Sequence, residues 1–402
     1  MNAKTITPRR LRALTIAVGG ASLLGALAAQ AAEGTRALHQ TFPAGGEVRI
    51  ANLAGRIELA SGPGKEIVVD ATIHAEGSGA AETQRLLQGI SWAQEHDKKG
   101  RPQWVLTYPV SKYHAFAYPR LAQKHQEELP WFLSFLENVG QTSSNYRGER
   151  VKIYSDRRSS APTLYADLRI TLPAGANLGV RNVVGPVKGN ALEGTLDIDT
   201  GSGKVEIVSH VGQLTIDTGS GDVIVGSVKG ETSIDTGSGD VVVSRWIGNG
   251  KVDTGSGNVV VKQVSGGKIS LDTGSGDVTV EGGVVGKILA DTGSGNVKVV
   301  GVELEELEAD TGSGDVTVKS PLAKARRIHA DTGSGDVTIS GGPDAAFAIT
   351  ADQGSGDLIV GYADATLRKD GHKVVGAKRG DGRTTILCET GSGDCEIRPN
   401  TL

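Results

Sequence analysis

The sequence is poor in the large side chains that fill wide globular interiors. Its 402 residues include 1 Met and 2 Cys, and the aromatic residues are limited to 4 Trp, 7 Tyr and 5 Phe. Protein interiors are close-packed, so a chain with few bulky side chains is suited to a narrow core. The abundance of glycine, 58 residues, points the same way. Composition alone therefore favours thin, repetitive β structure.

Signatures of catalysis and of nucleotide binding are also missing. The sequence has no Gly-x-Ser-x-Gly elbow, P-loop or dinucleotide fingerprint, and its glycines lie in turns between strands and not before helices. None of the 8 His stands at the spacing of a metal site or a catalytic triad. We therefore expect a protein that is not an enzyme and that needs no cofactor, with bound Ca²⁺ as the one alternative considered below.

Residues 1–31 have the pattern of a secretory signal peptide. Four basic residues precede an apolar stretch over residues 14–29, and Ala29-Gln30-Ala31 forms a small-residue cleavage site. The alternative is a membrane anchor, but the stretch is short for a bilayer and contains Gly and Ser. We expect cleavage, a mature chain that begins near Ala32, and export to the periplasm, the extracellular space or the cell surface.

The charge of the chain is acidic. The formal net charge is -4, and it becomes -8 when residues 1–31, with four basic and no acidic residues, are removed. Because binding to phosphates needs a basic face, we expect no nucleic-acid partner. No later segment is long and apolar enough to span a membrane, so no membrane span is expected after signal removal.

The five-residue motif Asp-Thr-Gly-Ser-Gly recurs through the second half of the chain. Successive copies lie 18 to 21 residues apart, except that the last follows after 37. Aliphatic and polar residues alternate around each motif, which predicts a short strand on either side of a turn. The acids that open the copies, the last two of them variants, are Asp199, Asp217, Asp235, Asp253, Asp272, Asp291, Asp310, Asp331, Asp352 and Glu389.

A single pair of such strands cannot bury its own apolar edge, so the copies must stack. We predict an all-β chain, a β-helix-like β-solenoid of about 12 two-strand rungs spaced by about 4.8 Å and roughly 55 Å long. Two rungs, over residues 48–59 and 178–187, lack the acidic turn but keep its second glycine at Gly55 and Gly185. We expect that glycine position to require φ > 0.

Four segments follow from these patterns. The signal peptide over residues 1–31 precedes N-terminal strands and a first degenerate rung over 32–80. A helical and aromatic insertion covers 81–162, and the β-solenoid repeat domain covers 163–402. Within the insertion, the apolar spacing predicts short helices over residues 81–96, 121–129 and 131–139.

The chain resembles the putative-adhesin family of exported bacterial β-strand repeat proteins, a domain of unknown function. The features that carry the resemblance are the segment over residues 46–57, Leu172-Pro173-Ala174-Gly175 before the array, and the Gly-Ser-Gly-Asp-Val turns. It covers about 45–75 and 165–397, and it implies a β-strand repeat fold and an exported, adhesin-like protein. The aromatic insertion departs from the family pattern.

Stacking would align carboxylates in two outward columns. The first acid column holds the acids that open the copies, from Asp199 to Asp352. The second acid column follows the turns and consists of Asp222, Asp240, Asp277, Asp315, Asp336 and Asp357, interrupted by Lys204, Asn258 and Asn296. Like charges about 4.8 Å apart repel by roughly 1 kcal/mol even in water, so we expect something to compensate them.

Two interpretations of the acid columns stay open. Each first-column Asp could accept hydrogen bonds from amides of its own turn. Alternatively, the carboxylates could bind Ca²⁺, which prefers oxygen ligands. The candidate metal ligands are Asp217, Asp222, Asp235, Asp240, Asp272 and Asp277. Catalysis by an aspartic-protease-like Asp-Thr-Gly-Ser pair is excluded, because copies on adjacent rungs leave no room for two lobes and a cleft.

Cys388 and Cys395 flank the last turn, at the columns that Leu271 and Val278 occupy in an earlier copy. Both side chains should face inward across the turn. In an oxidising compartment we predict a disulfide that pins the terminal rung and stabilises it by roughly 2 to 3 kcal/mol. A metal site on these thiols would lack further ligands nearby.

Most of the aromatic residues fall in the insertion. They either line a groove for a protein or glycan partner or form the insertion's own core. The candidate contact residues are Trp104, Tyr108, Tyr113, Phe116, Tyr118, Trp131 and Phe132.

Three functions remain open at this point. The first is a non-catalytic exported envelope or surface protein, an adhesin-like scaffold in which the solenoid is a stiff spacer and the insertion or one flat face binds a protein or glycan. The second is a polysaccharide-acting β-helix enzyme, which would need a cluster of acids and bases that breaks the repeat pattern. The third is a repeat surface that binds cations or ordered water through rows of Thr, such as Thr254 and Thr273.

Overall fold

The computed structural model describes residues 33–97, 99–119, 141–154 and 160–400. In these ranges the chain forms 31 strands and one helix, α1. The predicted all-β class is confirmed. The signal peptide expected at residues 1–31 and the helices expected at 121–129 and 131–139 lie outside the described residues, as do Trp131 and Phe132.

The N-terminal body combines antiparallel and parallel strands with α1. Its elements are β1 (Glu33–Pro43), β2 (Glu47–Ala54), β3 (Ile57–Ser61), β4 (Glu66–Glu76), α1 (Ala80–Gln88), β5 (Ser91–His96), β6 (Pro102–Thr107), β7 (Ala115–Ala117), β8 (Gln141–Tyr146), β9 (Glu149–Tyr154) and β10 (Thr163–Leu172).

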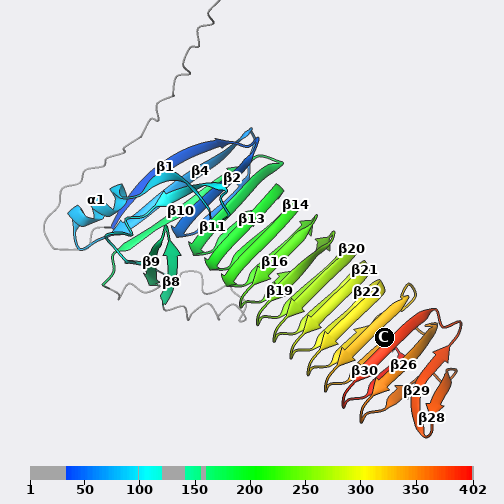
Figure 1. Cartoon of the computed structure of the whole chain (residues 1–402). Helices are drawn as coiled ribbons and strands as arrows, with labels where there is room; N and C mark the ends of the chain where they lie inside the picture. Colours follow the sequence, from blue (N-terminus) through cyan, green and yellow to red (C-terminus); the bar gives the residue numbers. More distant parts are fainter. Residues whose placement is uncertain (1–32, 98, 120–140, 155–159, 401–402) are drawn as a thin grey trace, which may run out of the picture.

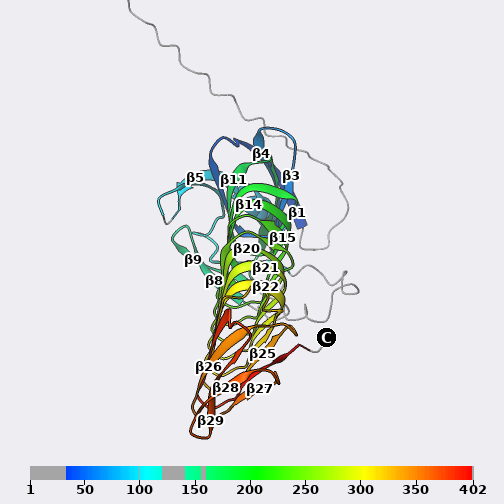
Figure 2. The same cartoon turned by 90° about the vertical axis from the view of Figure 1, so that its right-hand side faces the viewer.

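The repeats form an elongated array of parallel strands that lie over one another in register (Figure 1). The strands before the turns make the leading ladder, in which Ile198 aligns with Ile216 and Ile216 with Ile234. The strands after the turns make the trailing ladder, in which Val205 aligns with Val223. Seen from the side in Figure 2, the two ladders lie on opposite sides of the array. The copies therefore stack as the alternation of apolar residues predicts.

The strands of the array vary in length because some continue from one copy into the next. They are β11 (Ala176–Val184), β12 (Val187–Asn190), β13 (Leu192–Ser202), β14 (Val205–Ser220), β15 (Val223–Lys229), β16 (Thr232–Thr236), β17 (Val241–Val243), β18 (Trp246–Ile247), β19 (Gly250–Thr254), β20 (Val259–Thr273), β21 (Val278–Thr292), β22 (Val297–Thr311), β23 (Val316–Lys319), β24 (Arg327–Thr332), β25 (Val337–Gly341), β26 (Phe347–Gln353), β27 (Leu358–Val360), β28 (Thr366–Asp370), β29 (Lys373–Arg379), β30 (Thr384–Thr390) and β31 (Cys395–Pro399).

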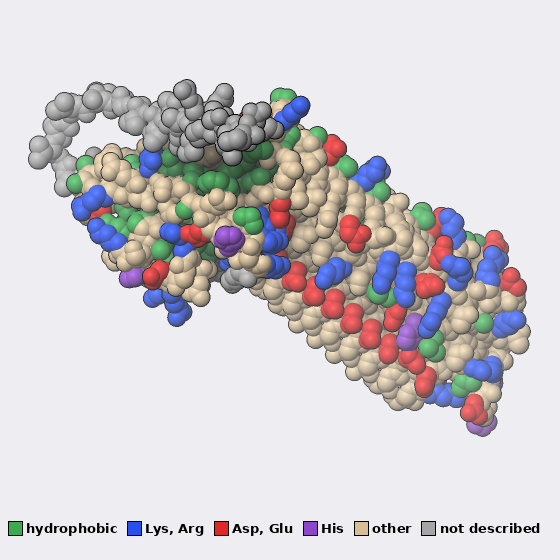
Figure 3. All heavy atoms as spheres, turned by 45° about the horizontal axis from the view of Figure 1, so that its top comes forward, with side chains coloured by type: hydrophobic (Ala, Val, Ile, Leu, Met, Phe, Trp, Pro, Cys, Tyr) green, Lys and Arg blue, Asp and Glu red, His purple; other side chains and the backbone are tan. Residues whose placement is uncertain are grey.

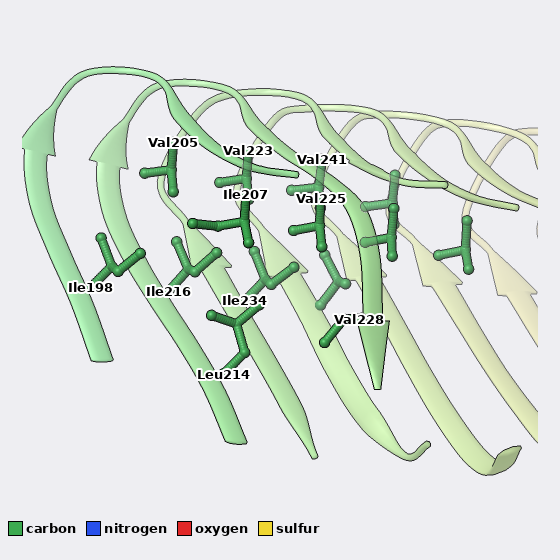
Figure 4. Close-up of a cluster of buried hydrophobic side chains, with 14 of the residues drawn as sticks. Ile198, Val205, Ile207, Leu214, Ile216, Val223, Val225, Val228, Ile234 and Val241 are labelled. Atoms are coloured by element: carbon green, nitrogen blue, oxygen red, sulfur yellow. The ribbon is translucent and has the colours of Figure 1, made fainter. Parts of the chain in front are cut away.

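Columns of aliphatic side chains fill the space between the ladders (Figure 4). Ile198, Ile216 and Ile234 form one column, and Val205 and Val223 belong to a facing one; all five are buried. Each buried side chain of this size contributes about 1.5–3 kcal/mol. The core is therefore narrow and continuous, which suits a chain with few aromatic residues.

The two predicted degenerate rungs extend the array toward the N-terminus. Val48 in β2 aligns with Leu178 in β11, and Leu178 aligns with Leu196 in β13. In the trailing ladder, Ile57 of β3 aligns with Val187 of β12. This confirms that both segments share the register of the repeats although they lack the acidic turn.

The second glycine of the turn is required for two different reasons. At Gly221 φ is +153°, a conformation that favours glycine, as predicted. Gly276, in a later copy, is not among the glycines with positive φ. There a Cβ would overlap the backbone carbonyl oxygen of Gly257 in the neighbouring copy. The expectation of φ > 0 is thus wrong for the later copies, where close stacking of backbones excludes any side chain.

The order of the strands at the C-terminal end differs from their order in the sequence (Figure 1). In the leading ladder β30 lies between β24 and β26, so that Glu389 aligns with Asp331 on one side and with Asp352 on the other. In the trailing ladder β31 likewise lies between β25 and β27. The last 37-residue interval contains the β28–β29 hairpin, which folds back on β26 and returns the chain to this place. We call β30 and β31 the return strands.

Cys388 and Cys395 form a disulfide, as predicted. Both residues are buried, in the columns of Ala330 and Val337. The expectation that the bond pins the terminal rung is wrong, because the rung of Asp352 lies beyond the return strands. The disulfide instead closes a turn inside the array.

Antiparallel pairs lie near both ends of the array, although β2 itself pairs with β6 in parallel. At the N-terminal end β4 pairs with β1 and β10 antiparallel, and β10 lies parallel to β3. At the C-terminal end β29 pairs antiparallel with β26.

The insertion is less helical than predicted. The helix expected over residues 81–96 ends at Gln88, and Ser91–His96 form β5, which pairs antiparallel with β6. Gly89 is the C-cap residue, and its amide donates to the carbonyl oxygens of Arg85 and Leu86. No helix in the described part of the chain has the length and hydrophobicity needed to cross a membrane.

Candidate functional site

The Thr of each motif points into the array and not toward solvent. The side chain of Thr273 is 1% exposed. Its hydroxyl donates to the carbonyl oxygen of Gly257 in the preceding copy at 2.8 Å and accepts from the amide of Gly276 in its own turn at 3.2 Å. The same pair of bonds recurs at Thr292, Thr311 and Thr332. The hypothesis of an exposed Thr row that binds ions or water is therefore wrong, because these hydroxyls tie neighbouring turns together.

The first acid column runs along an outer face of the array, where Figure 3 shows a line of acidic side chains. Asp217 aligns with Asp235, and the register continues copy by copy to Asp331. Within the described residues, no hydrogen bond or ion pair compensates the side chains of Asp235, Asp253, Asp272, Asp291 and Asp310. The predicted role of the first Asp as the cap of its own turn is wrong. The amide of Gly274, two residues after Asp272, donates to the carbonyl oxygen of Thr254, and the amide of Gly276 donates to the Thr273 hydroxyl.

The environment of the first column disfavours its ionised form. Partial burial, followed by repulsion from neighbouring carboxylates, raises the pKa of Asp235, Asp272 and Asp291 above the usual 3.8. At the N-terminal end of the column, Arg181 Nε lies 3.8 Å from a carboxylate oxygen of Asp199. The column is thus balanced at that end and uncompensated along its middle.

A pH dependence of stability follows from this arrangement. A carboxyl whose pKa is raised by folding binds its proton more tightly in the folded state, so its contribution to stability falls as pH rises through the raised pKa. We expect the first-column variant, Asp235→Asn/Asp272→Asn/Asp291→Asn, to melt at a higher temperature than the unaltered chain at pH 7. The gain in free energy of unfolding should be at most about 1 kcal/mol per residue, because solvent screens these charges. The difference should shrink as pH is lowered toward 3.8. Thermal melts of both proteins across that range test this, and a constant difference would contradict it.

The second acid column is compensated by backbone amides. The Asp240 carboxylate accepts from the amide of Asn258 in the next copy at 2.8 Å, and Asp277 accepts from the amide of Asn296 at 2.7 Å. The side-chain oxygen of Asn258 accepts from the amide of Asp277 in the same way. Because Asn performs this role as well as Asp, the column is a hydrogen-bonded ladder in which charge is not required.

The six predicted calcium ligands do not converge. A straight column gives each carboxylate only its two neighbours, whereas Ca²⁺ takes six to eight oxygen ligands. Among the described residues, one group of three potential ligand atoms lies within 4.8 Å, and it contains none of the six. Asp217, Asp222, Asp235, Asp240, Asp272 and Asp277 therefore form no such group with one another or with other His, Cys, Asp or Glu side chains in the described residues, and calcium binding along the columns stays a prediction.

That group consists of His329, Asp331 and Glu389. His329 Nε2 lies 2.6 Å from Glu389 Oε2. His329 and Asp331 point to the same side of β24, and Glu389 reaches them from β30. Sequence reasoning missed this cluster because 58 residues separate the two acids. The one available signal was Glu389, which replaces the Asp of the motif.

The predicted aromatic contact residues lie mostly inside the N-terminal body. Tyr108 and Phe116 are 2% and 0% exposed. The Tyr108 hydroxyl donates to Asn52 Oδ1 at 2.9 Å, and burial raises the pKa of Tyr108 well above its usual value. These two rings cannot line an open groove, which supports the alternative that the insertion has its own aromatic core.

The other described candidates are partly buried. Trp104 packs against Phe42 with ring centroids 5.2 Å apart, and Tyr118 packs against Tyr165 at 5.0 Å. The Tyr113 hydroxyl donates to Glu82 Oε1 at 3.2 Å. Each ring thus has an internal partner, although part of it still faces solvent.

A shallow basic pocket of about 510 Å³ lies beside β3 and β12. Its cations include Arg56, Lys188 and Lys204. Arg56 lies 3.2 Å from Glu58, and Lys188 and Lys204 lie 3.2 and 3.8 Å from Glu206. Arg169 also lines the pocket, so four cations lie beside the two carboxylates of Glu58 and Glu206.

Comparison with protein families finds a match, which lies in the repeats. Residues 233–398 match the family described as Toastrack DUF4097. This part of the chain is thus similar to a domain of unknown function. The resemblance predicted from the turns is thereby confirmed, and the Toastrack match covers β17 to β31 with the return strands and the disulfide included.

Solved structures similar to this chain come from three bacteria. A putative lipid binding protein from Parabacteroides distasonis is 12% identical, with 90% of this chain and 96% of that chain covered and a TM-score of 0.34. A putative adhesin from Bacteroides fragilis is 13% identical, with 90% and 97% covered and a TM-score of 0.29. A putative cell adhesion protein from Clostridium sporogenes is 8% identical, with 91% and 100% covered and a TM-score of 0.15. Comparison with curated proteins returns no match.

Proposed function

We propose that the protein is a non-catalytic, exported envelope or surface scaffold, in which a stiff β-solenoid of about 12 rungs presents the first acid column to a protein or glycan partner that carries positive charge. The observation that carries this proposal is the contrast between the two acid columns. The second column is bonded to backbone amides, whereas the carboxylates in the middle of the first column have no hydrogen bond or ion pair within the described residues, and Lys251 lowers the pKa of Asp235 only in part.

Contact with a cationic partner would relieve the repulsion within the column. A regular row of carboxylates favours a partner whose cationic groups are also arranged along a line, such as an extended basic segment of a protein or an amino-sugar polymer. Complementary charge of this kind increases association rate and specificity, and it weakens as salt screens the charges.

Export is supported by the disulfide. Disulfides persist in oxidising compartments such as the periplasm and the extracellular space, and they are rare in the cytosol. Cys388 and Cys395 are paired inside the array. This agrees with the secretory pattern of residues 1–31.

A matched pair of variants tests the acid column as the contact surface. The first-column variant defined above removes three carboxylates from the uncompensated column. The second-column variant, Asp222→Asn/Asp240→Asn/Asp277→Asn, removes the same charge from the other column and keeps the ladder, because Asn258 and Asn296 already occupy it. The two variants are compared by capture from envelope extracts. The captured partner is identified, and its affinity for each variant is measured at two salt concentrations.

We expect the first-column variant to lose about 1–3 kcal/mol of binding free energy, the sum of three exposed charge contacts, and the second-column variant to bind like the unaltered chain. Equal losses in both variants would reduce the effect to net charge. Unchanged capture by the first-column variant would move the contact surface to the N-terminal body. Release of products from a panel of polysaccharides by the purified chain would overturn the non-catalytic assignment in favour of the lyase-like alternative.

A further inference from the structure

The cluster of His329, Asp331 and Glu389 is a break in the regularity of the array. Elsewhere along the first acid column, each carboxylate is followed in the next copy by another at the same register, without an imidazole beside it. At this place His329 precedes Asp331 by two residues on β24, so both side chains leave the same face of the strand. Three different ligand atoms then lie within 4.8 Å of one another.

The return strands bring the third side chain to this place. Glu389 on β30 aligns with Asp331, although it follows it by 58 residues. Glutamate is one methylene longer than the aspartate of the motif, and its Oε2 comes within 2.6 Å of His329 Nε2. Cys388, next to Glu389, is held by the disulfide inside the turn. The cluster is therefore built on two paired strands and a covalently closed turn.

We propose that His329, Asp331 and Glu389 bind a first-row divalent transition metal ion of the Zn²⁺ class. An imidazole nitrogen with two carboxylate oxygens suits Zn²⁺, which accepts nitrogen and oxygen ligands, better than Ca²⁺, which takes only oxygen. Three protein ligands leave a fourth position for water or for a group from a partner. The proposal is independent of the acid column as a contact surface.

The surroundings of the cluster favour a cation. His329 aligns with Glu308 on β22, and Asp331 aligns with Asp310. A carboxylate oxygen of Glu308 lies 3.5 Å from Lys287 Nζ. Asp310 beside Asp331 and Asp352 beside Glu389 add two further carboxylates next to the cluster. The side chains of His329 and Glu389 are 25% and 36% exposed, so a metal ion can enter while solvent screening of the site is reduced.

The competing explanation is an ion pair between His329 and Glu389 with no metal. The two differ in what a bound metal would do to the fold. A metal ion would link β24 to β30, and it would hold the return strands in place in addition to the disulfide. An ion pair would be insensitive to added metal.

The proposal is tested on the full-length mature chain near neutral pH. Zn²⁺ binding is measured by calorimetry, and Co²⁺ is added as a coloured substitute whose absorption is recorded. We expect about one equivalent of metal per chain, a visible Co²⁺ absorption typical of nitrogen and oxygen ligands, and slower amide exchange in β24 and β30 when metal is added. His329→Gln, which keeps a hydrogen-bonding side chain beside Glu389, should weaken binding by at least about 100-fold, the upper end of what loss of an outer-shell partner costs.

Two further variants separate this site from the acid column. Glu389→Asp restores the residue of the motif and withdraws the carboxylate from His329, and we expect about a tenfold loss of affinity. Asp272→Asn changes the same column far from the cluster and should bind within about twofold of the unaltered chain. Absence of a stoichiometric site, or equal binding by His329→Gln and the unaltered chain, would overturn the proposal. A loss in Asp272→Asn as large as that in His329→Gln would assign the binding to the acid column instead.

Discussion

Deletion of residues 384–402 is expected to unfold the chain from β26 onward, while the array up to β24 remains folded. The deleted segment holds the return strands, which lie between β24 and β26 and between β25 and β27. Ile386 and Ile397 are 1% and 0% exposed, and each contributes about 1.5–3 kcal/mol by burial. Without them, β26 loses its parallel neighbour and the hairpin behind it has nothing to cover.

Hydrogen exchange read by mass spectrometry checks this region by region. We expect β26 to β29 to lose protection in the truncated chain and β13 to β22 to keep it, because the coupling in a repeat array is between neighbours. Full-length chain with Cys388→Ala and Cys395→Ala is the control. It loses the disulfide, which stabilises by about 2–3 kcal/mol, but keeps the strands, so protection of β26 should fall without disappearing. Full protection of β26 in the truncated chain would show that the return strands are dispensable.

Gly276→Ala is expected to be among the most destabilising single methyl additions in the array. A Cβ at this position would overlap the carbonyl oxygen of Gly257 and crowd the amide of Asn258. Both obstacles are backbone, so they can move only if two stacked turns separate. Separation would also break the bond from the Thr273 hydroxyl to Gly257. We expect a cost of at least about 3 kcal/mol, the upper end for overpacking.

Ser275→Ala is the matched control, because Ser275 is the exposed middle residue of the same turn and its change should stay within about 0.5 kcal/mol. Amide exchange of β20 and β21 in both variants localises the effect better than a single melting temperature, since an array need not unfold in one step. Similar stability of the two variants would mean that the stacked turns tolerate a side chain after all.

The repeat register could be predicted from the sequence because the residues of each apolar column recur at a nearly constant interval. Ile198, Ile216 and Ile234 recur at the same place relative to the motif, and a shift by one residue would expose the whole column. The disulfide followed from the same register, since Cys388 and Cys395 occupy two inward positions across one turn.

What could not be predicted depends on contacts between distant segments or between neighbouring backbones. The sequence order suggested that Glu389 ends the array, and only the fold of the β28–β29 hairpin places it beside Asp331. The His329 cluster was missed for the same reason. The direction of the Thr273 side chain was misjudged because a polar residue was assumed to face water. Its burial is favourable only because Gly257 and Gly276 of two adjacent turns satisfy its hydroxyl.

The antiparallel strands at the two ends of the array have a consequence for how the molecules behave at high concentration. Parallel, in-register stacking of like segments is also the geometry of amyloid fibrils, in which every new chain extends an open edge. Here β29 occupies the edge of β26 in the opposite direction, and the last trailing strand, β27, is only 3 residues long. A second molecule therefore cannot add a long parallel strand to the C-terminal end of the array. The molecule can use a fibril-like interior and still remain a particle of fixed length.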